Sequence, residues 1–188
     1  MNGHRTERDT GAMVEDLTNW WQAADIRHGL LIAGGGLAIW AAASDVRRFL
    51  IPNRAVILLL LSGIFFVAVG GGPDGQFAGV GYHALGFAGV LAVGFAAYLL
   101  NFFGAGDAKL LAALSIWMGP PGAVMLIVHT VLLGGVLAIG WSFSRPLRTA
   151  LMVAGLPVDP EPPAEIPYGV AIAGAGLIGF ADLWPSVI

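Results

Sequence analysis

Cysteine is absent from the 188-residue chain, and charged residues are scarce at 11%. The lack of cysteine excludes disulfides, a thiol nucleophile and a cysteine-ligated zinc site. A soluble domain has about 25% charged residues, so this chain has too few charges to cover a water-exposed surface. The formal net charge of −3 at pH 7 gives no basis for binding nucleic acid.

Hydrophobic residues make up 57% of the chain, and most of them gather in six apolar runs. Several runs are shorter than the ~20 residues that cross a bilayer unaided, so we expect flanking residues to join the helices or the membrane to thin locally. The pattern predicts an all-α membrane protein with six transmembrane helices. The runs lie near residues 29–44, 55–70, 79–100, 107–118, 122–142 and 166–184.

The segments outside these runs divide the chain into a tail and one membrane domain. Residues 1–28 are polar and mixed in charge, and tryptophans at their end favour a short interfacial helix over 13–27. Residues 29–188 form the predicted six-helix domain. Pro120 and Pro121 mark a turn between two runs. Residues 143–165 contain five prolines, which predicts a linker in the longest internal loop.

The cations are unevenly divided between the two faces of a six-span topology. The termini carry three of the nine Lys and Arg residues, and the loops at 45–54, 101–109 and 143–165 carry the other six. By the positive-inside rule these three loops face the cytoplasm. Asp45 and Asp107 both fall in these loops, so charge counting places both carboxylates at the same membrane face.

Asp107 and Asp45 are the acidic residues that directly adjoin strong apolar runs at their cation-rich ends. An ionisable residue at the edge of the hydrocarbon layer is costly and indicates a functional site. Each also has a structural interpretation. Asp107 is a favoured residue type for capping the helix that follows it, and Asp45 is close in sequence to Arg47 and Arg48.

A pair of carboxylates at hydrogen-bonding distance shares a proton and titrates as a unit. One carboxylate then accepts a proton from water while the other donates to a carbonyl oxygen. The sequence offers few rival chemistries. The histidines have no metal-site spacing, and His83 and His129 are expected to be hydrogen-bonded within the bundle. The serines lack a Gly-x-Ser-x-Gly elbow, and the glycines near Asp107 do not make a phosphate-binding loop.

Three motifs together resemble the type IV prepilin leader peptidases, the membrane aspartyl proteases with a Gly-x-Gly-Asp motif. The resemblance covers roughly residues 30–180, and the short length is similar to the branch that serves tight-adherence (Flp-type) pili. In chain order, the motifs are Asp45 followed by Ile51-Pro52-Asn53, then Gly104-Ala105-Gly106-Asp107-Ala108-Lys109-Leu110, then Pro167-Tyr168-Gly169-Val170.

The resemblance implies a prepilin peptidase in the bacterial inner membrane, with its active site facing the cytoplasm. It removes the short basic leader of prepilins and pseudopilins after a glycine, without metal or cofactor, and the pilus assembly machinery is a further partner to consider. Asp45 and Asp107 are the implied catalytic pair. The implied supporting residues are Gly104, Gly106, Lys109, Pro52, Asn53, Pro167, Tyr168 and Gly169.

Long members of this family carry paired Cys-x-x-Cys motifs in a cytoplasmic domain and methylate the new pilin N-terminus. This chain has no cysteine, so we expect no methyltransferase activity. Two alternatives belong to other functional classes. One is a small transporter or channel component that uses Asp45 and Asp107 as proton or cation sites, although these acids lie at run edges and no internal repeat is visible. The other is a non-enzymatic assembly scaffold.

Overall fold

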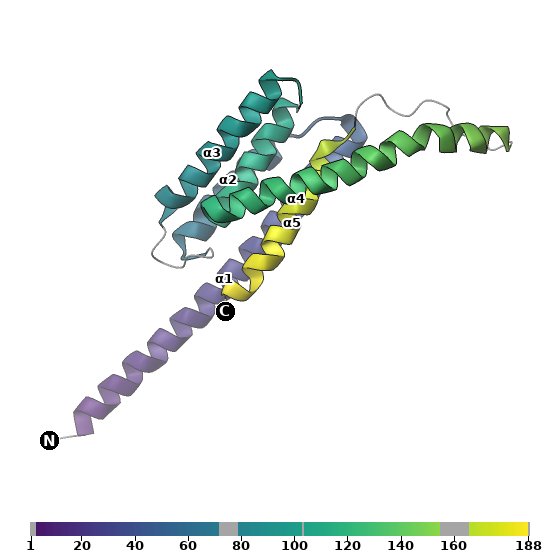
Figure 1. Ribbon diagram of the computed structural model, residues 1–188. Helices are drawn as coiled ribbons and strands as arrows, with labels where there is room; N and C mark the ends of the chain where they lie inside the picture. The colour runs from purple at the N-terminus through teal and green to yellow at the C-terminus, as the bar shows by residue number, and fades with distance from the viewer. Residues whose placement is uncertain (1–2, 72–78, 103, 155–165, 188) are drawn as a thin grey trace.

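The computed structural model of the protein is a bundle of helices (Figure 1). It describes residues 3–71, 79–102, 104–154 and 166–187, and no strand occurs among them. The helices are α1 (Gly3–Arg48), α2 (Asn53–Ala68), α3 (Val80–Leu99), α4 (Ala105–Val153) and α5 (Tyr168–Leu183), followed by the short 3-10 helix η2 (Trp184–Val187).

The bundle is built from apolar helices of unequal length. Three helical segments are long and apolar enough to cross a membrane, namely Ile26–Arg48, Val80–Leu99 and Ala105–Phe143, and the shorter α2 and α5 are apolar as well. The 39 residues of Ala105–Phe143 would extend ~58 Å as one straight helix, about twice the ~30 Å hydrocarbon core.

This long segment does not continue straight, because Gly119 interrupts it with φ 66° and ψ 179°. A positive φ is readily adopted by glycine and strained for other residues. The part of α4 before Gly119 packs beside α3, and the part after it runs on toward α5 (Figure 1). The described chain therefore contains six apolar helical segments, which confirms the predicted all-α membrane fold.

The break in α4 leaves a carbonyl group that the helix itself cannot satisfy. Pro120 has no N–H to donate to the carbonyl of Ile116 four residues earlier. His83 on α3 replaces it, because its Nδ1 lies 2.7 Å from the Ile116 oxygen. A carbonyl only accepts, so Nδ1 carries the proton. The His83 side chain is 1% exposed, and it is hydrogen-bonded within the bundle as predicted.

The core of the bundle is centred on Trp117, which is fully buried. Its ring fits against two glycines, because a Cβ added at Gly34 would lie 2.9 Å from its Cη2 and one at Gly63 would lie 2.6 Å from its Nε1. Its Nε1–H donates to the carbonyl oxygen of Leu59 at 3.1 Å. Phe66 and Phe180 pack on it with ring centroids about 5 Å away. The indole thus joins α1, α2, α4 and α5.

Two predicted boundaries differ from the structure. The backbone of α1 is one helix from Gly3, so the tail continues directly into the first apolar helix and no separate interfacial helix precedes it. The predicted loop 143–165 is also too long, because α4 continues to Val153 with Pro146 inside it. Residues 155–165 lie outside the described chain. The start of α1 and the end of α4 both project from the bundle (Figure 1).

The contact between His83 and Ile116 leads to a stability prediction. His83→Leu should lower the free energy of unfolding by about 1–3 kcal/mol, because it leaves a buried carbonyl without a donor. His83→Asn should lose less, since its amide nitrogen occupies nearly the position of Nδ1. Thermal unfolding in detergent checks both variants, and a leucine variant as stable as the asparagine variant would contradict the assignment.

Candidate active site

Asp45 lies in the last turn of α1 and is 6% exposed. Its Oδ2 accepts a hydrogen bond of 2.8 Å from the backbone N–H of Gly169. Gly169 is the second residue of α5, 124 positions further along the chain. The partial negative charge at the end of α1 disfavours a carboxylate there, whereas the N-terminus of α5 attracts one. Asp45 is therefore held by a different helix from the one that carries it.

The start of α5 needs an acceptor from outside the helix. Its N-cap residue is Pro167, which makes no side-chain capping hydrogen bond. A capping side chain normally accepts from the second or third N–H of the helix. The carboxylate of Asp45 takes this role from α1 and satisfies one of the N–H groups that α5 cannot pair internally.

Gly169 allows this contact because it has no side chain. A Cβ at this position would lie 2.8 Å from Oδ2 of Asp45 and 3.0 Å from its Cβ and Cγ. Real Cβ atoms do not approach other heavy atoms so closely, so any other residue would displace the carboxylate or the helix. The close packing of α5 on Asp45 therefore requires glycine at position 169.

Asp107 is held by a local contact at the start of α4. The first helical hydrogen bond runs from Ala108 N–H to the carbonyl of Gly104, which makes Gly104 the N-cap and Asp107 the third helical residue. Oδ2 of Asp107 accepts a hydrogen bond of 3.1 Å from the Gly104 N–H. This is the reciprocal half of a capping box. The suggestion that Asp107 itself is the N-cap is therefore wrong in position, although the side chain does stabilise this helix end.

The connection between α1 and α2 packs against the start of α4. Phe49 turns the chain with a φ of 51°, and the hydroxyl of Ser44 donates to the Leu50 carbonyl at 2.9 Å. Pro52 is the N-cap of α2. A Cβ added at Gly106 would lie 3.3 Å from Cβ of Ile51, so the small residue at 106 lets α4 approach this connection. These contacts bring the ends of α1 and α4 together.

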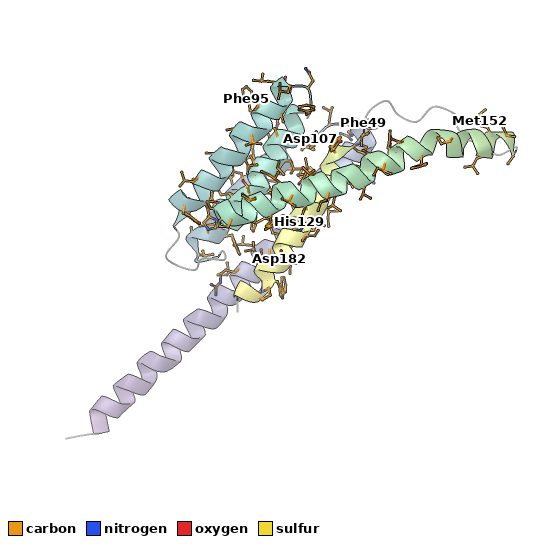
Figure 2. All side chains as sticks on the ribbon, viewed as in Figure 1. Phe49, Phe95, Asp107, His129, Met152 and Asp182 are labelled. Carbon is orange, nitrogen blue, oxygen red and sulfur yellow. The ribbon has the colours of Figure 1, made fainter. Side chains whose placement is uncertain are left out.

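Asp45 and Asp107 line two cavities at this end of the bundle, and they are close enough to interact electrostatically. The first cavity has a volume of about 500 Å³, and its other lining residues are Phe49, Asn101, Phe102, Gly104, Ile166 and Tyr168. The second, of about 380 Å³, is lined besides the two carboxylates by Phe49–Ile51, Asn53, Gly104–Gly106 and Lys109. Figure 2 labels Phe49 and Asp107 at this end.

Most residues singled out from the sequence gather here. Gly104, Gly106, Lys109, Asn53 and Tyr168 line one or both cavities, and Gly169 bonds Asp45 directly. Gly169 does not line either cavity itself, and neither do the N-cap residues Pro52 and Pro167, which precede α2 and α5.

Sequence reasoning missed five lining residues, namely Phe49, Leu50, Asn101, Phe102 and Ile166. The residue type of Asn101 does indicate a turn after α3. Asparagine tolerates a positive φ better than most residues, and Asn101 has a φ of 60°. Phe49 has a similar backbone with no such signal. Phe102 and Ile166 look like ordinary ends of apolar runs.

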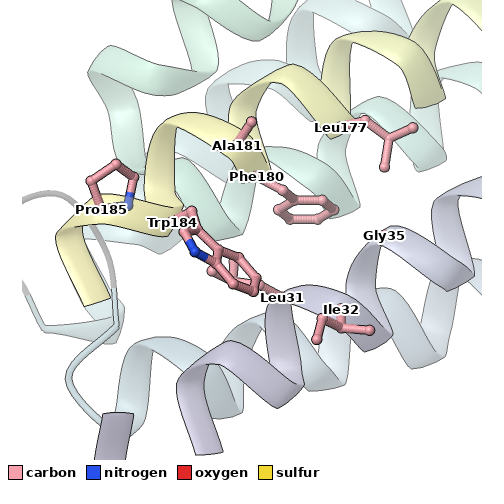
Figure 3. Close-up of a pocket in the computed structure, with 8 residues that line it drawn as sticks. All are labelled: Leu31, Ile32, Gly35, Leu177, Phe180, Ala181, Trp184 and Pro185. Atoms are coloured by element: carbon pink, nitrogen blue, oxygen red, sulfur yellow. The ribbon is translucent and has the colours of Figure 1, made fainter. Parts of the chain in front are cut away.

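Two further cavities are lined mostly by apolar residues. One of about 470 Å³ lies between α1 and α5, lined by apolar residues such as Leu31, Phe180 and Trp184 (Figure 3). Another, of about 310 Å³, contains His129 and Asp182 among apolar residues, and Figure 2 shows both away from Asp107. No group of three or more potential His, Asp or Glu metal ligands is found within the described residues.

The hydrogen bond between Asp45 and Gly169 gives a testable difference between two neutral variants. Asp45→Asn keeps an oxygen that accepts the Gly169 N–H, whereas Asp45→Ala leaves this buried donor unpaired. Loss of a capping acceptor costs about 1 kcal/mol, so the alanine variant should be less stable than the asparagine variant by this amount. Chemical unfolding in detergent measures the difference. Equal stabilities would show that Asp45 does not cap α5.

Comparison with known families gives a match. The sequence model described as the Type IV leader peptidase family matches residues 32–139, more than half of the chain, and this region contains both carboxylates. Searches of curated proteins and of solved structures give no match. The apolar helices and the family match make the chain a multi-pass membrane protein and a peptidase. It belongs to the type IV leader peptidase family.

Proposed function

We propose that the chain is a prepilin peptidase that cuts the short basic leader from type IV prepilins after a glycine, using Asp45 and Asp107 as the catalytic pair. The observation that carries this proposal is that both carboxylates, 62 positions apart in the sequence, line the same cavities at one end of the bundle. The family match supports the leader peptidase function.

The proposed reaction needs the two carboxyl groups in opposite protonation states. The ionised group takes a proton from water as the water oxygen attacks the glycyl carbonyl carbon. The protonated group gives its proton to the carbonyl oxygen, which yields a tetrahedral diol. Collapse of the diol returns that proton, breaks the C–N bond and moves the other proton to the departing amine. Both carboxyl groups thereby regain their starting states.

The proposed orientation puts the active site at the cytoplasmic face of the bacterial inner membrane. Six of the nine cations, including Arg47, Arg54 and Lys109, belong to the segments at the end that holds the carboxylates. A prepilin joins a basic leader to an apolar membrane helix, so its scissile bond would lie at this face. We further propose Flp-type prepilins or pseudopilins as substrates, delivery to the pilus assembly machinery, and no methyltransferase activity.

The catalytic pair is tested by co-expressing the chain with a tagged prepilin and following leader loss by gel shift. The wild type should cleave. Asp45→Asn and Asp107→Asn should each lose activity by several orders of magnitude, because an amide cannot exchange the protons that the mechanism requires. Asparagine keeps each oxygen acceptor, so the Gly169 and Gly104 N–H groups remain bonded and the fold should survive.

Equal membrane levels and equal thermal stability of the three proteins are the controls. Cleavage that survives either substitution would rule out the paired mechanism. A wild type that cleaves no prepilin but conducts protons, with flux lost in both variants, would instead favour a transporter.

The positioning role of Gly169 gives a second test of the same site. Gly169→Ala should reduce the cleavage rate at least tenfold, because its Cβ would occupy the space of the Asp45 carboxylate. Gly174→Ala is the matched control on the same helix, since its Cβ would meet a terminal methyl of Leu133 at 3.1 Å, away from the cavities. Similar cleavage rates for the two variants would contradict this role.

A further inference from the structure

The cavity of about 310 Å³ between the second part of α4 and the end of α5 contains a second pair of ionisable side chains. His129 comes from α4 and Asp182 from α5, and Figure 2 shows both away from Asp107. The proposed peptidase reaction uses neither of them. The side chains around them are apolar and include Met118, Met125, Leu126 and Leu183.

Asp182 is an exposed carboxylate in the last turn of α5, which ends at Leu183. The partial negative charge of a helix C-terminus disfavours an anion there, and the last turn of α5 has no basic residue that would compensate it. Among the described residues, none forms a hydrogen bond or an ion pair with Asp182. A cation from outside the described chain is therefore attracted to this carboxylate.

His129 is a half-buried side chain in the second part of α4. The expectation that it is hydrogen-bonded within the bundle is not met, because no hydrogen bond joins it to another described residue. His83 differs, since its Nδ1 bonds the carbonyl of Ile116. A polar side chain in a membrane bundle is costly without a partner, and an imidazole carries at least one N–H that donates. His129 therefore offers a donor to an occupant of the cavity.

The two helices that form the cavity run in opposite directions. α5 begins beside Asp45 and ends beside Met118, because a Cβ added at Gly179 would lie 2.5 Å from its Sδ. The second part of α4 begins at this same end of the bundle, directly after Gly119. Higher residue numbers on α4 and lower ones on α5 therefore lie further inside the bundle.

This arrangement puts the two ionisable side chains at different depths. Asp182 lies two residues before Trp184, which is 43% exposed and is a residue type enriched at the membrane interface. His129 lies ten residues beyond Gly119, ~15 Å along the helix. We therefore place the carboxylate at the level of the lipid headgroups and the imidazole closer to the hydrocarbon.

A phospholipid with a primary amine in its headgroup has its own groups in this order. Its ammonium is outermost, its phosphodiester and glycerol esters lie deeper, and its acyl chains are apolar. The ammonium donates charge-assisted hydrogen bonds to a carboxylate such as Asp182, and the N–H of His129 suits a phosphodiester or ester oxygen. Met125 lines the cavity and is 58% exposed, so the surrounding lipid has access to the cavity.

Charge and hydrogen bonding disfavour other occupants. A headgroup with a negative charge and no amine would be repelled by Asp182. A choline headgroup is cationic but has no N–H to donate. A metal ion lacks ligands, because no group of three or more potential His, Asp or Glu ligands occurs among the described residues.

We propose that this cavity binds one aminophospholipid such as phosphatidylethanolamine. Its ammonium bonds Asp182, an oxygen of its phosphodiester or glycerol esters accepts from His129, and an acyl chain packs on Met125. The site joins the second part of α4 to the end of α5. This inference is independent of the proposed peptidase function, because it needs only a membrane protein.

The test is a lipid titration of the purified chain in detergent, with bound lipid counted by native mass spectrometry. Three lipids with identical acyl chains are compared: phosphatidylethanolamine, phosphatidylcholine and phosphatidylglycerol. The wild type should bind phosphatidylethanolamine about tenfold more tightly than the other two, since only its ammonium makes a charge-assisted hydrogen bond with Asp182.

Variants assign the preference to the two side chains. Asp182→Asn should raise the Kd for phosphatidylethanolamine about tenfold, to the value for phosphatidylcholine, whereas Asp182→Glu should keep the preference. His129→Leu should weaken all three lipids by a similar factor, because the phosphodiester and esters are common to them, and His129→Gln should weaken them less. Ser142→Ala is the control, because Ser142 is an exposed polar residue of α4 that does not line the cavity.

Each contrary result overturns the inference. Equal affinity of the wild type for the three lipids, or no binding of any, would show that the cavity does not select an amine. A preference that persists in Asp182→Asn would place the amine elsewhere on the protein. A preference lost equally in Ser142→Ala would show general damage rather than recognition at this cavity.

Discussion

A buried carboxylate at the C-terminus of one helix is stabilised here by a hydrogen bond from the N-terminus of another helix. Asp45 sits where the dipole of α1 opposes its charge, and the Gly169 N–H at the start of α5 compensates. This requires α1 and α5 to lie side by side in opposite directions, with little side-chain bulk between them. Gly34 and Gly35 of α1 permit that approach, because a Cβ at these positions would lie 3.1 Å from Phe180 and 3.4 Å from Leu177 of α5.

The position of the second carboxylate, Asp107, depends on the reversal of the chain at Gly119. If α4 ran straight through Gly119, the bundle would lose the short segment that packs beside α3, and Asp107 would not return to the end that holds Asp45. The turn is stable because His83 satisfies the carbonyl of Ile116 that Pro120 leaves open. Trp117, the neighbour of that carbonyl, fixes the same segment in the core. The position of Asp107 at one end of the bundle thus relies on a polar contact at the other end.

Much of the fold could be predicted from the sequence because burial in lipid selects for long apolar runs. Six runs gave the helical segments, and Pro120 with Pro121 marked the reversal. The extension of α4 past residue 143 was missed, because Pro146 suggests a break but lies within the helix. The continuity of α1 through the polar tail was missed because the change from polar to apolar residues near residue 28 suggested a boundary. The glycines of α1 do not end the helix, and no proline lies between residues 3 and 48.

The candidate site was predicted in its residues but not in its contacts. Asp45 and Asp107 stand out from composition, since few charges border apolar runs. The hydrogen bond from Gly169 to Asp45 spans 124 positions, and no local pattern encodes a partner so distant. Phe49 was missed because its positive φ is imposed by the tertiary packing around it. Residue types therefore indicated the chemistry, whereas the positioning of the carboxylates came from the way the helices pack.

The unbroken helix α1 has a consequence for the position of Asp45. The backbone that carries Asp45 is the same rod whose other end projects well beyond the bundle. No loop therefore separates the projecting end from Asp45, and the two lie toward opposite ends of one continuous helix. The position of the carboxylate is set by the same backbone that extends out of the bundle on the far side.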